Sequence, residues 1–226
     1  FLKNVTGIQS SRDKLAISFS KIKLVEKIQK FIDPNLSDDY IRDYFFSKGK
    51  RSNKYKKGDT RGWKVSDARK FLGISYSSML IKEIDFRPFD SRWIYYSKAI
   101  VDWPRYDVMK HMQQNNLSLN LHRSVMNKEF AHISVSNKII DLHSLDSALG
   151  SYHFPLFLYE DNKIKEVFGK DDRKPNLNKE ILVEISTKLG LTFINEKEES
   201  DSTFAPIDIL DYIYAVLHSP KYREKY

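Results

Sequence analysis

DFRPFDSRWIYYSKAIVDWPRYDVMKHM, residues 85–112, is the stretch that decides the expected fold, because it joins a strand-like pattern to a helix-like one. Its first half contains six residues that suit a pleated surface, namely Phe86, Phe89, Trp93, Ile94, Tyr95 and Tyr96. Pro88 predicts a bend or an edge between two strand halves, since proline cannot donate to the middle of a sheet. Pro104 predicts the start of a helix, whose first turn needs no N–H from that residue. We therefore expect a strand pair that leads into a short amphipathic helix.

Outward from this stretch, the spacing of apolar residues predicts helices before and after a run of strands. The expected helices cover residues 21–32, 37–46, 63–72, 177–189 and 206–218. The other expected strands are two short ones within residues 1–19, joined by a turn at residues 9–13, and residues 117–121, 131–135, 138–142 and 152–159. The predicted fold class is α+β, with a mainly antiparallel sheet between residues 80 and 160 that is flanked by helices at both ends.

Two of these helices carry an apolar face that indicates which side is buried. The helix at residues 21–32 is expected to bury Ile22, Val25, Ile28 and Ile32. The helix at residues 206–218 is expected to bury Ile207, Leu210, Tyr214 and Leu217. Such faces predict that both helices pack against a core.

Positive charge is concentrated in one segment. Ten basic and two acidic residues lie between residues 48 and 70, so the net charge of this segment equals the +8 of the whole chain. Clustered cations can track a phosphate backbone, and the alternative is a solvated, mobile loop. We expect residues 1–75 to form an N-terminal segment of strands and helices that carries this basic loop. Residues 76–226 are expected to form a sheet-centred domain with C-terminal helices.

Composition and missing motifs exclude several classes of protein. A hydrophobic content of 41% indicates a globular chain, and the absence of cysteine excludes disulfides and thiolate metal sites. No apolar run approaches the roughly 20 residues of a membrane span, and no signal peptide is visible, so we expect a cytoplasmic protein without a membrane partner. No G-x-G or G-x-x-x-x-G-K pattern is present, nor the Asn-Pro-Pro-aromatic motif of adenine methyltransferases. The six histidines form no i,i+4 pair, which argues against a metal site.

One nuclease-like pattern can be assembled. Asp161 and Lys163 form an acidic-x-Lys pair, and Asp141 lies upstream as a possible second carboxylate for a metal. About three such pairs are expected by chance from this composition. The pattern therefore supports a nuclease only weakly.

Arginines at the ends of regular elements are a sharper signal. Arg92, Arg105 and Arg123 lie at such positions beside apolar neighbours, and arginine both reads guanine through two hydrogen bonds and binds phosphate. The alternative is ion pairing with nearby aspartates. We favour pairing for Arg92, which lies beside Asp90, and leave both possibilities open for Arg105 and Arg123.

Several blocks of the sequence together carry a resemblance. They are GIQSSRDKLAISF (7–19), FRPFDSRWIYY (86–96), PRYDVMKHM (104–112), NLSLNLHR (116–123), HISVSNKIID (132–141), FPLFLY (154–159) and DYIYAVLHSPKYREKY (211–226). The first block resembles the segment that opens the target-recognition region of adenine methyltransferases. The others resemble the C-terminal specificity region of single-chain, Type ISP-like restriction-modification enzymes. The resemblance covers nearly the whole chain in order.

This resemblance implies a piece of a longer enzyme that recognises a sequence in double-stranded DNA and has no catalytic residues of its own. Its protein partners would be the methyltransferase and the helicase or nuclease domains of the parent chain. We expect no cofactor here, because S-adenosylmethionine, ATP and Mg²⁺ would serve only those other domains. The residues expected to contact DNA are Lys48, Lys50, Arg51, Lys54, Lys56, Lys57, Arg61, Arg92, Arg105 and Arg123. The alternatives are a metal-dependent DNA nuclease and a protein-docking domain of a DNA-processing enzyme.

Overall fold

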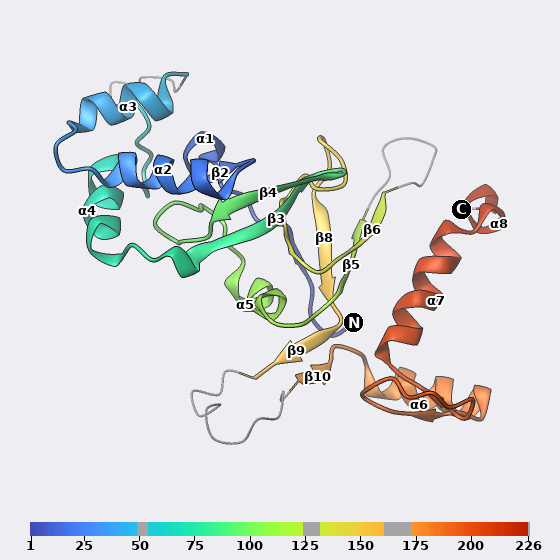
Figure 1. The fold of residues 1–226 in the computed structure, drawn as a ribbon. Coiled ribbons are helices and arrows are strands. Elements are labelled where there is room, and N and C mark those ends of the chain that lie inside the picture. Colours follow the sequence, from blue (N-terminus) through green and yellow to red (C-terminus); the bar gives the residue numbers. More distant parts are fainter. Residues whose placement is uncertain (49–53, 124–131, 161–172, 226) are drawn as a thin grey trace, which may run out of the picture. The chain divides into compact units, whose positions relative to one another are not determined.

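The chain folds into two units that group different parts of the sequence (Figure 1). The computed structural model describes residues 1–48, 54–123, 132–160 and 173–225. We call Ile8–Pro104 the hairpin unit, and Phe1–Gly7 together with Arg105–Tyr226 the sheet unit. These packing units do not test the functional division expected after residue 75, which stays a prediction.

In the hairpin unit, the stretch that opens the sequence analysis forms a β-hairpin. β3 (Ile81–Arg87) pairs antiparallel with β4 (Asp90–Tyr95), and β2 (Ile17–Ser18) pairs antiparallel with the other side of β4. A register shift just before the turn marks a bulge. Pro88 lies in the turn itself, where its missing N–H costs no hydrogen bond of the sheet. The predicted bend between two strand halves is confirmed.

The helices of this unit precede the hairpin in the sequence. They are α1 (Asp13–Ala16), α2 (Lys21–Ile32), α3 (Asp38–Phe46), α4 (Val65–Ser75) and the 3-10 turn η1 (Ser78–Leu80). Ser20 and Ser37 cap α2 and α3, because their hydroxyl oxygens accept an N–H of the first helical turn at 3.5 and 3.2 Å. The predicted helices at residues 21–32 and 37–46 are therefore confirmed. The second short strand expected before residue 19 is reduced to β2, because Asp13–Ala16, the end of the expected turn and the residues after it, form the single helical turn α1.

The buried face of α2 differs from the expected one. Leu24, Ile28 and Phe31 are buried, whereas Ile22 is 72% exposed. The expected and observed stripes share Ile28, and the observed one places the ring of Phe31 5.9 Å from that of Phe45, edge to face. An aromatic pair of this kind buries a large apolar area, which favours this stripe over the aliphatic one. The predicted face was wrong.

α4 lies further along the chain than expected. The sequence indicated a helix over residues 63–72 ended by Gly73, but the helix covers Val65–Ser75 and includes that glycine. A Cβ added at Gly73 would meet open space, so no close approach requires a glycine there. The helix continues through it at a propensity cost of about 1 kcal/mol. The start is held at Val65, whose N–H donates to the Asp59 carboxylate at 2.9 Å.

The sheet unit is built on four antiparallel strands in the order β1 (Val5–Thr6), β8 (Ser151–Pro155), β5 (Ser118–His122) and β6 (Ile133–Ser136). Its other strands are β7 (Ile139–Ile140), β9 (Phe157–Tyr159), β10 (Arg173–Pro175), β11 (Thr192–Phe193) and β12 (Thr203–Phe204). Its helices are α5 (Tyr106–Met109), η2 (Lys110–Gln113), α6 (Lys179–Leu189), α7 (Pro206–His218) and α8 (Pro220–Lys225). β9 pairs antiparallel with β10, and β11 pairs parallel with β12. The predicted α+β fold with mainly antiparallel pairing is confirmed.

Alternation along β5 sorts apolar and polar side chains onto opposite faces of the sheet. On one face, Leu119 joins a cluster that includes Phe157 of β9 and Leu210 of α7, which is 1% exposed. On the other face, Asn120 Oδ1 lies 2.8 Å from Nδ1 of His153 on β8, and both residues are 0% exposed. The central strands are thus joined by a buried polar pair as well as by their backbone.

The C-terminal helix α7 has the predicted bounds but a slightly different buried face. Ile207, Leu210 and Leu217 pack on the sheet as expected, while Tyr214 is 36% exposed and Ile213 packs in its place. Asp208 accepts the N–H of the residue before the helix at 2.8 Å and so caps it. None of the helices within the described ranges is long and apolar enough to cross a membrane.

Replacing Leu210 with aspartate should lower the free energy of unfolding by roughly 3–5 kcal/mol, because it places an unpaired charge in the cluster under α7. Chemical denaturation monitored by circular dichroism measures this loss. Tyr212→Asp is the matched control, since Tyr212 lies on the same helix and is 71% exposed. Equal midpoints for Leu210→Asp and the parent chain would show that the helix is peripheral.

The buried His153 should make the protein sensitive to acid. Burial lowers the pKa of His153 to about 3, from an ordinary value near 6.5. As the pH falls from about 6.5 towards 3, His153 binds a proton in the unfolded chain but not in the folded chain. The free energy of unfolding should therefore decrease, with a slope of up to about 1.4 kcal/mol per pH unit from this group. In urea titrations at pH 7, 6 and 5, His153→Gln should show a smaller loss than the parent chain, and equal losses would contradict this assignment.

Candidate nucleic-acid interface

The basic segment predicted from the sequence lies in the hairpin unit. Of the described residues, Lys48, Lys54, Lys56 and Arg61 are exposed. The ammonium of Lys57 lies 2.6 Å from the carboxylate of Asp43, so part of its charge is already neutralised. The predicted contacts Lys50 and Arg51 fall outside the described residues.

A buried ion pair fixes the course of residues 54–64. Arg42 of α3 is 5% exposed, and its Nη1 lies 2.6 Å from Asp59 and 2.7 Å from the carbonyl oxygen of Lys57. The same Asp59 carboxylate holds the first N–H of α4. A further backbone hydrogen bond of 2.8 Å joins Thr60 to the carbonyl of Trp63. Residues 54–64 of the basic segment form a loop that is held between α3 and α4, whereas residues 65–70 belong to α4.

Trp63 anchors this loop from the inside. Its indole N–H donates to the carbonyl of Ala99 at 2.6 Å, and the guanidinium of Arg12 lies 4.0 Å from its ring centroid. Arg12 is itself buried, donates to the carbonyl of Ile100 at 2.9 Å and lies 3.6 Å from Asp102. Burial lowers the pKa of Arg12, and its carbonyl and carboxylate partners offset the cost of placing a cation there. These contacts give Trp63 a structural role.

A shallow cleft of about 430 Å³ opens beside Trp63 in the same unit. Its lining includes Arg61, Lys64 and Lys98 together with the exposed ring of Phe71. Lys98 is far from the basic segment in the sequence, so it was not among the residues predicted to contact DNA. Asp67 also lines the cleft, so three cations and one carboxylate surround it, and the excess of positive charge favours an anionic group there.

The hairpin contains an arginine that is already paired. Both carboxylate oxygens of Asp90 accept hydrogen bonds from Arg92, with an Nε–Oδ1 distance of 3.0 Å and an Nη2–Oδ2 distance of 2.6 Å. The same guanidinium stacks on Phe19 and Phe86, 3.9 and 4.2 Å from their ring centroids. The expected pairing of Arg92 is found. It leaves fewer donors for DNA, although the predicted contact itself stays a prediction.

Two predicted arginines lie in the sheet unit. Arg105 precedes α5 in a left-handed conformation with φ 54°. Arg123 is exposed just after β5, with its guanidinium 5.5 Å from the ring centroid of Tyr152. A hydrogen bond to Tyr152 raises the pKa of Arg123, which therefore stays charged. Arg123 therefore follows directly after a central strand, and Tyr152 holds its exposed guanidinium.

The residues beside Arg123 form a small cluster at the same end of the sheet. His122 is 4% exposed, and its Nδ1 lies 3.0 Å from the carbonyl of Gly150. Its ring centroid is 5.2 Å from that of His132, whose Nε2 is 3.9 Å from Asp146. Burial is the main cause that lowers the pKa of His122, so its neutral form is favoured. The cluster supports the end of β5 beside Arg123.

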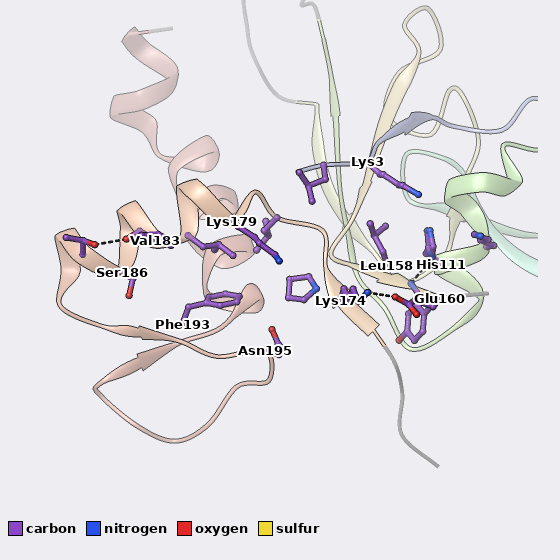
Figure 2. A pocket seen from close by; sticks show the side chains of 17 residues that line it. Lys3, His111, Leu158, Glu160, Lys174, Lys179, Val183, Ser186, Phe193 and Asn195 are labelled. Atoms are coloured by element: carbon purple, nitrogen blue, oxygen red, sulfur yellow. Dashed lines mark hydrogen bonds and ion pairs between the residues drawn. The ribbon is translucent and has the colours of Figure 1, made fainter. Parts of the chain in front are cut away.

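The sheet unit also contains a groove of about 920 Å³ (Figure 2). Four lysines line it, namely Lys3, Lys110, Lys174 and Lys179. Glu160, the acidic residue of the lining, pairs with Lys174, and this ion pair lowers the pKa of Glu160. Leu158 and Phe193 lie on opposite sides of the groove, as Figure 2 shows. These lysines are far apart in the sequence, so no local sequence pattern could have predicted that they line one groove.

The nuclease alternative finds no support among the described residues. No group of three or more His, Asp or Glu side chains within them is placed to hold a metal ion. Asp141 is 3% exposed, and its carboxylate accepts the N–H of His143 at 2.9 Å. Asp161 and Lys163, the other two residues of the pattern, lie outside the described ranges.

Comparison with solved structures identifies similar folds on DNA-bound proteins. The chain is 22% identical to DrdV in a cryoEM structure of the DrdV–DNA complex, with a TM-score of 0.68, covering 99% of this chain and 20% of that one. It is 20% identical to LlaBIII, an ATP-dependent Type ISP restriction-modification enzyme bound to DNA, with a TM-score of 0.65, covering 99% and 13%. It is 22% identical to a nuclease-deletion mutant of the Type ISP enzyme LlaGI in complex with a DNA substrate mimic, with a TM-score of 0.58, covering 100% and 19%. Identities this low show the fold, and this chain spans a fifth or less of each of those proteins.

Sequence comparison is more specific. No curated protein matches the chain. A family model described as the Type ISP C-terminal specificity domain matches residues 1–226, which is the whole sequence. The chain therefore belongs to the Type ISP C-terminal specificity domain family.

Proposed function

We propose that this chain recognises a specific sequence in double-stranded DNA as the target-recognition domain of a restriction-modification enzyme. The observation that carries the proposal is the family match over all 226 residues. Two features of the described structure support it: a loop of exposed cations held in place, and an arginine presented at the end of a central strand. The proteins with a similar fold were solved on DNA, which agrees with the same proposal.

In this proposal the basic loop holds the phosphate backbone. Lys48, Lys54, Lys56 and Arg61 are exposed, and the last three belong to the loop of residues 54–64 that Arg42 and Asp59 anchor, so the backbone of these three is held before DNA arrives. Fixed cations lose less conformational entropy on binding than cations on a mobile loop. Phosphate contacts set affinity and orientation and carry no sequence information. Lys50, Arg51 and Lys57 are expected to add to the same field.

Base recognition is assigned to arginines outside that loop. Arg123 is exposed just after a central strand and is hydrogen-bonded to Tyr152, and its remaining N–H groups suit hydrogen bonding to O6 and N7 of guanine in the major groove. Arg105 is a second predicted contact. For Arg92, the carboxylate pair with Asp90 makes a role in shaping the hairpin more favourable than direct base reading.

The chain is proposed to bind without catalysing a reaction. We propose that methylation, ATP hydrolysis and DNA cleavage belong to other domains of a longer cytoplasmic enzyme, which would use S-adenosylmethionine, ATP and Mg²⁺ and would be the protein partners of this one. Metal-dependent cleavage of DNA by the isolated chain would favour the nuclease alternative. The lysine-lined groove is the feature that a protein-docking role would use. A complete lack of DNA affinity at low salt would favour that role.

Removing cations from the loop should weaken binding to every duplex alike. In the triple variant Lys54→Ala, Lys56→Ala, Arg61→Ala, the slope of log K against log salt should flatten by about 0.9 for each lost phosphate contact. Fluorescence anisotropy titrations at several salt concentrations measure this, on a cognate duplex found by selection and on a random one. A loss of discrimination without a loss of affinity would reverse the roles assigned here.

The matched control removes the same charge elsewhere. Lys188→Ala, Lys221→Ala and Lys225→Ala together delete three cations from the C-terminal helices α6 and α8. We expect this variant to bind both duplexes nearly as the parent chain does. If this control variant lost as much affinity for DNA as the loop variant, affinity would depend on net charge alone, and the loop would not be a specific phosphate-binding element.

Arg123 should affect the choice of sequence. Arg123→Ala is expected to weaken binding to the cognate duplex roughly 10- to 100-fold and to change binding to random DNA much less, if the guanidinium reads a base. Arg123→Lys keeps the charge and loses the two-pronged geometry, so it should recover non-specific affinity but not discrimination. Equal losses on both duplexes for Arg123→Ala would make it a phosphate contact.

A further inference from the structure

The turn of the β3–β4 hairpin presents an aromatic ring in an unfavourable way. Phe89 has φ 59°, in the left-handed region that side chains other than glycine rarely adopt. Its relative exposure is 110%, which means that the ring makes no packing contribution to the fold. Both features lower stability, and neither is repaid by a contact within the described chain. Strain of this kind at an exposed position points to a function.

The support beneath Phe89 is rigid. On one side of the turn, Ser91 donates to the Asp85 carboxylate across the strands at 2.7 Å. On the same hairpin, both carboxylate oxygens of Asp90 accept hydrogen bonds from Arg92, and Arg92 stacks on Phe86. A ring on a rigid hairpin can insert into a binding partner with only a small loss of conformational entropy.

The surroundings of β4 indicate what kind of partner would meet this ring. Arg92 lies on β4 itself, and the ammonium of Lys21 lies 5.3 Å from the ring centroid of Trp93. Lys27 donates at 2.7 Å to the carbonyl of Ile17, a residue of β2, which pairs with β4. The charges of Arg92 and Lys14, after burial, lower the pKa of Lys27, so several cations share this region. A partner that combines negative charge with flat apolar surfaces satisfies both features, and nucleic acid bases on a phosphate backbone provide that combination.

We propose that Phe89 inserts between base steps of the recognised duplex and acts as an apolar wedge. The inference rests on the DNA recognition proposed above and assigns a further specificity-determining residue to it. Insertion unstacks one step, and pyrimidine–purine steps resist this least, so the wedge contributes to sequence choice without a hydrogen bond. Burial of the ring between bases provides the contact that repays its exposure and strain.

The test uses the whole chain and the cognate duplex found by selection, with 2-aminopurine placed in turn at each step. The parent chain should increase the fluorescence at one step, where insertion unstacks the probe. Phe89→Ala should abolish that increase and weaken cognate binding about 10- to 100-fold, with an unchanged salt slope. Phe89→Trp, which keeps a large ring, should retain both. Phe89→Gly should lose the DNA effects while matching or exceeding the thermal midpoint of the parent chain, because glycine relieves the left-handed strain.

Ile74→Ala is the matched control, since Ile74 is an exposed apolar residue of the same unit, at 92% exposure, and is expected to have no effect on DNA binding. If Phe89→Ala bound the cognate duplex like the parent chain, the wedge would be excluded, and a protein partner would be the remaining use for the ring. If affinity fell without any change in the 2-aminopurine signal at any step, the ring would contact DNA without insertion, which also overturns the proposal. Failure of the parent chain to bind any duplex would instead refute the proposed function itself.

Discussion

The buried ion pair between Arg42 and Asp59 is the constraint on which the proposed DNA surface depends. Arg42 comes from α3, and Asp59 also receives the first N–H of α4, so the pair joins two helices through the loop between them. A buried charge that loses its partner costs roughly 3–5 kcal/mol, which means that neither side chain can leave alone. The loop of residues 54–64 is therefore closed at its middle. The exposed cations of this loop are held in place by the Arg42–Asp59 ion pair, which is itself buried and does not contact DNA.

Much of the positive charge in the hairpin unit is used inside the protein. Arg69 donates to the carbonyl oxygens of Phe31, Asp33 and Leu36 at 2.7, 2.6 and 2.7 Å, where α2 ends and its last carbonyls need donors. Arg12 likewise donates a hydrogen bond to the carbonyl oxygen of Ile100. The net charge of +8 thus overstates the charge available to a partner, because such arginines serve carbonyls and carboxylates of the chain itself. Exposure, and not the count of basic residues, separates phosphate contacts from structural cations.

Local patterns predicted the fold better than the site. The helices at residues 21–32 and 206–218 have the predicted bounds, since Ser20 and Pro206 signal their starts in the adjacent sequence. Which stripe of α2 is buried depends on Phe45, a residue of another helix, and local spacing cannot show that. The pairing of Arg92 with Asp90 was visible because the two are neighbours on one strand. The lysines of the groove in the sheet unit come together only through folding, so no local signal existed for them.

Affinity and discrimination place opposite demands on a DNA-reading domain, and the roles proposed here assign them to different residues of this chain. Cations raise binding to all DNA, so every added lysine also strengthens competing non-specific complexes. Discrimination has to come from groups whose energy depends on the base, such as a two-pronged arginine or an apolar ring against the stack. Phosphate contacts are assigned to the anchored loop, and base contacts to Arg123 and Phe89, at a strand end and a hairpin turn. The backbone at a strand end or a hairpin turn holds Arg123 and Phe89 more rigidly than the flexible side chain of a lysine holds its ammonium group. A change in recognised sequence can then arise at the probes while the loop that holds the backbone stays as it is.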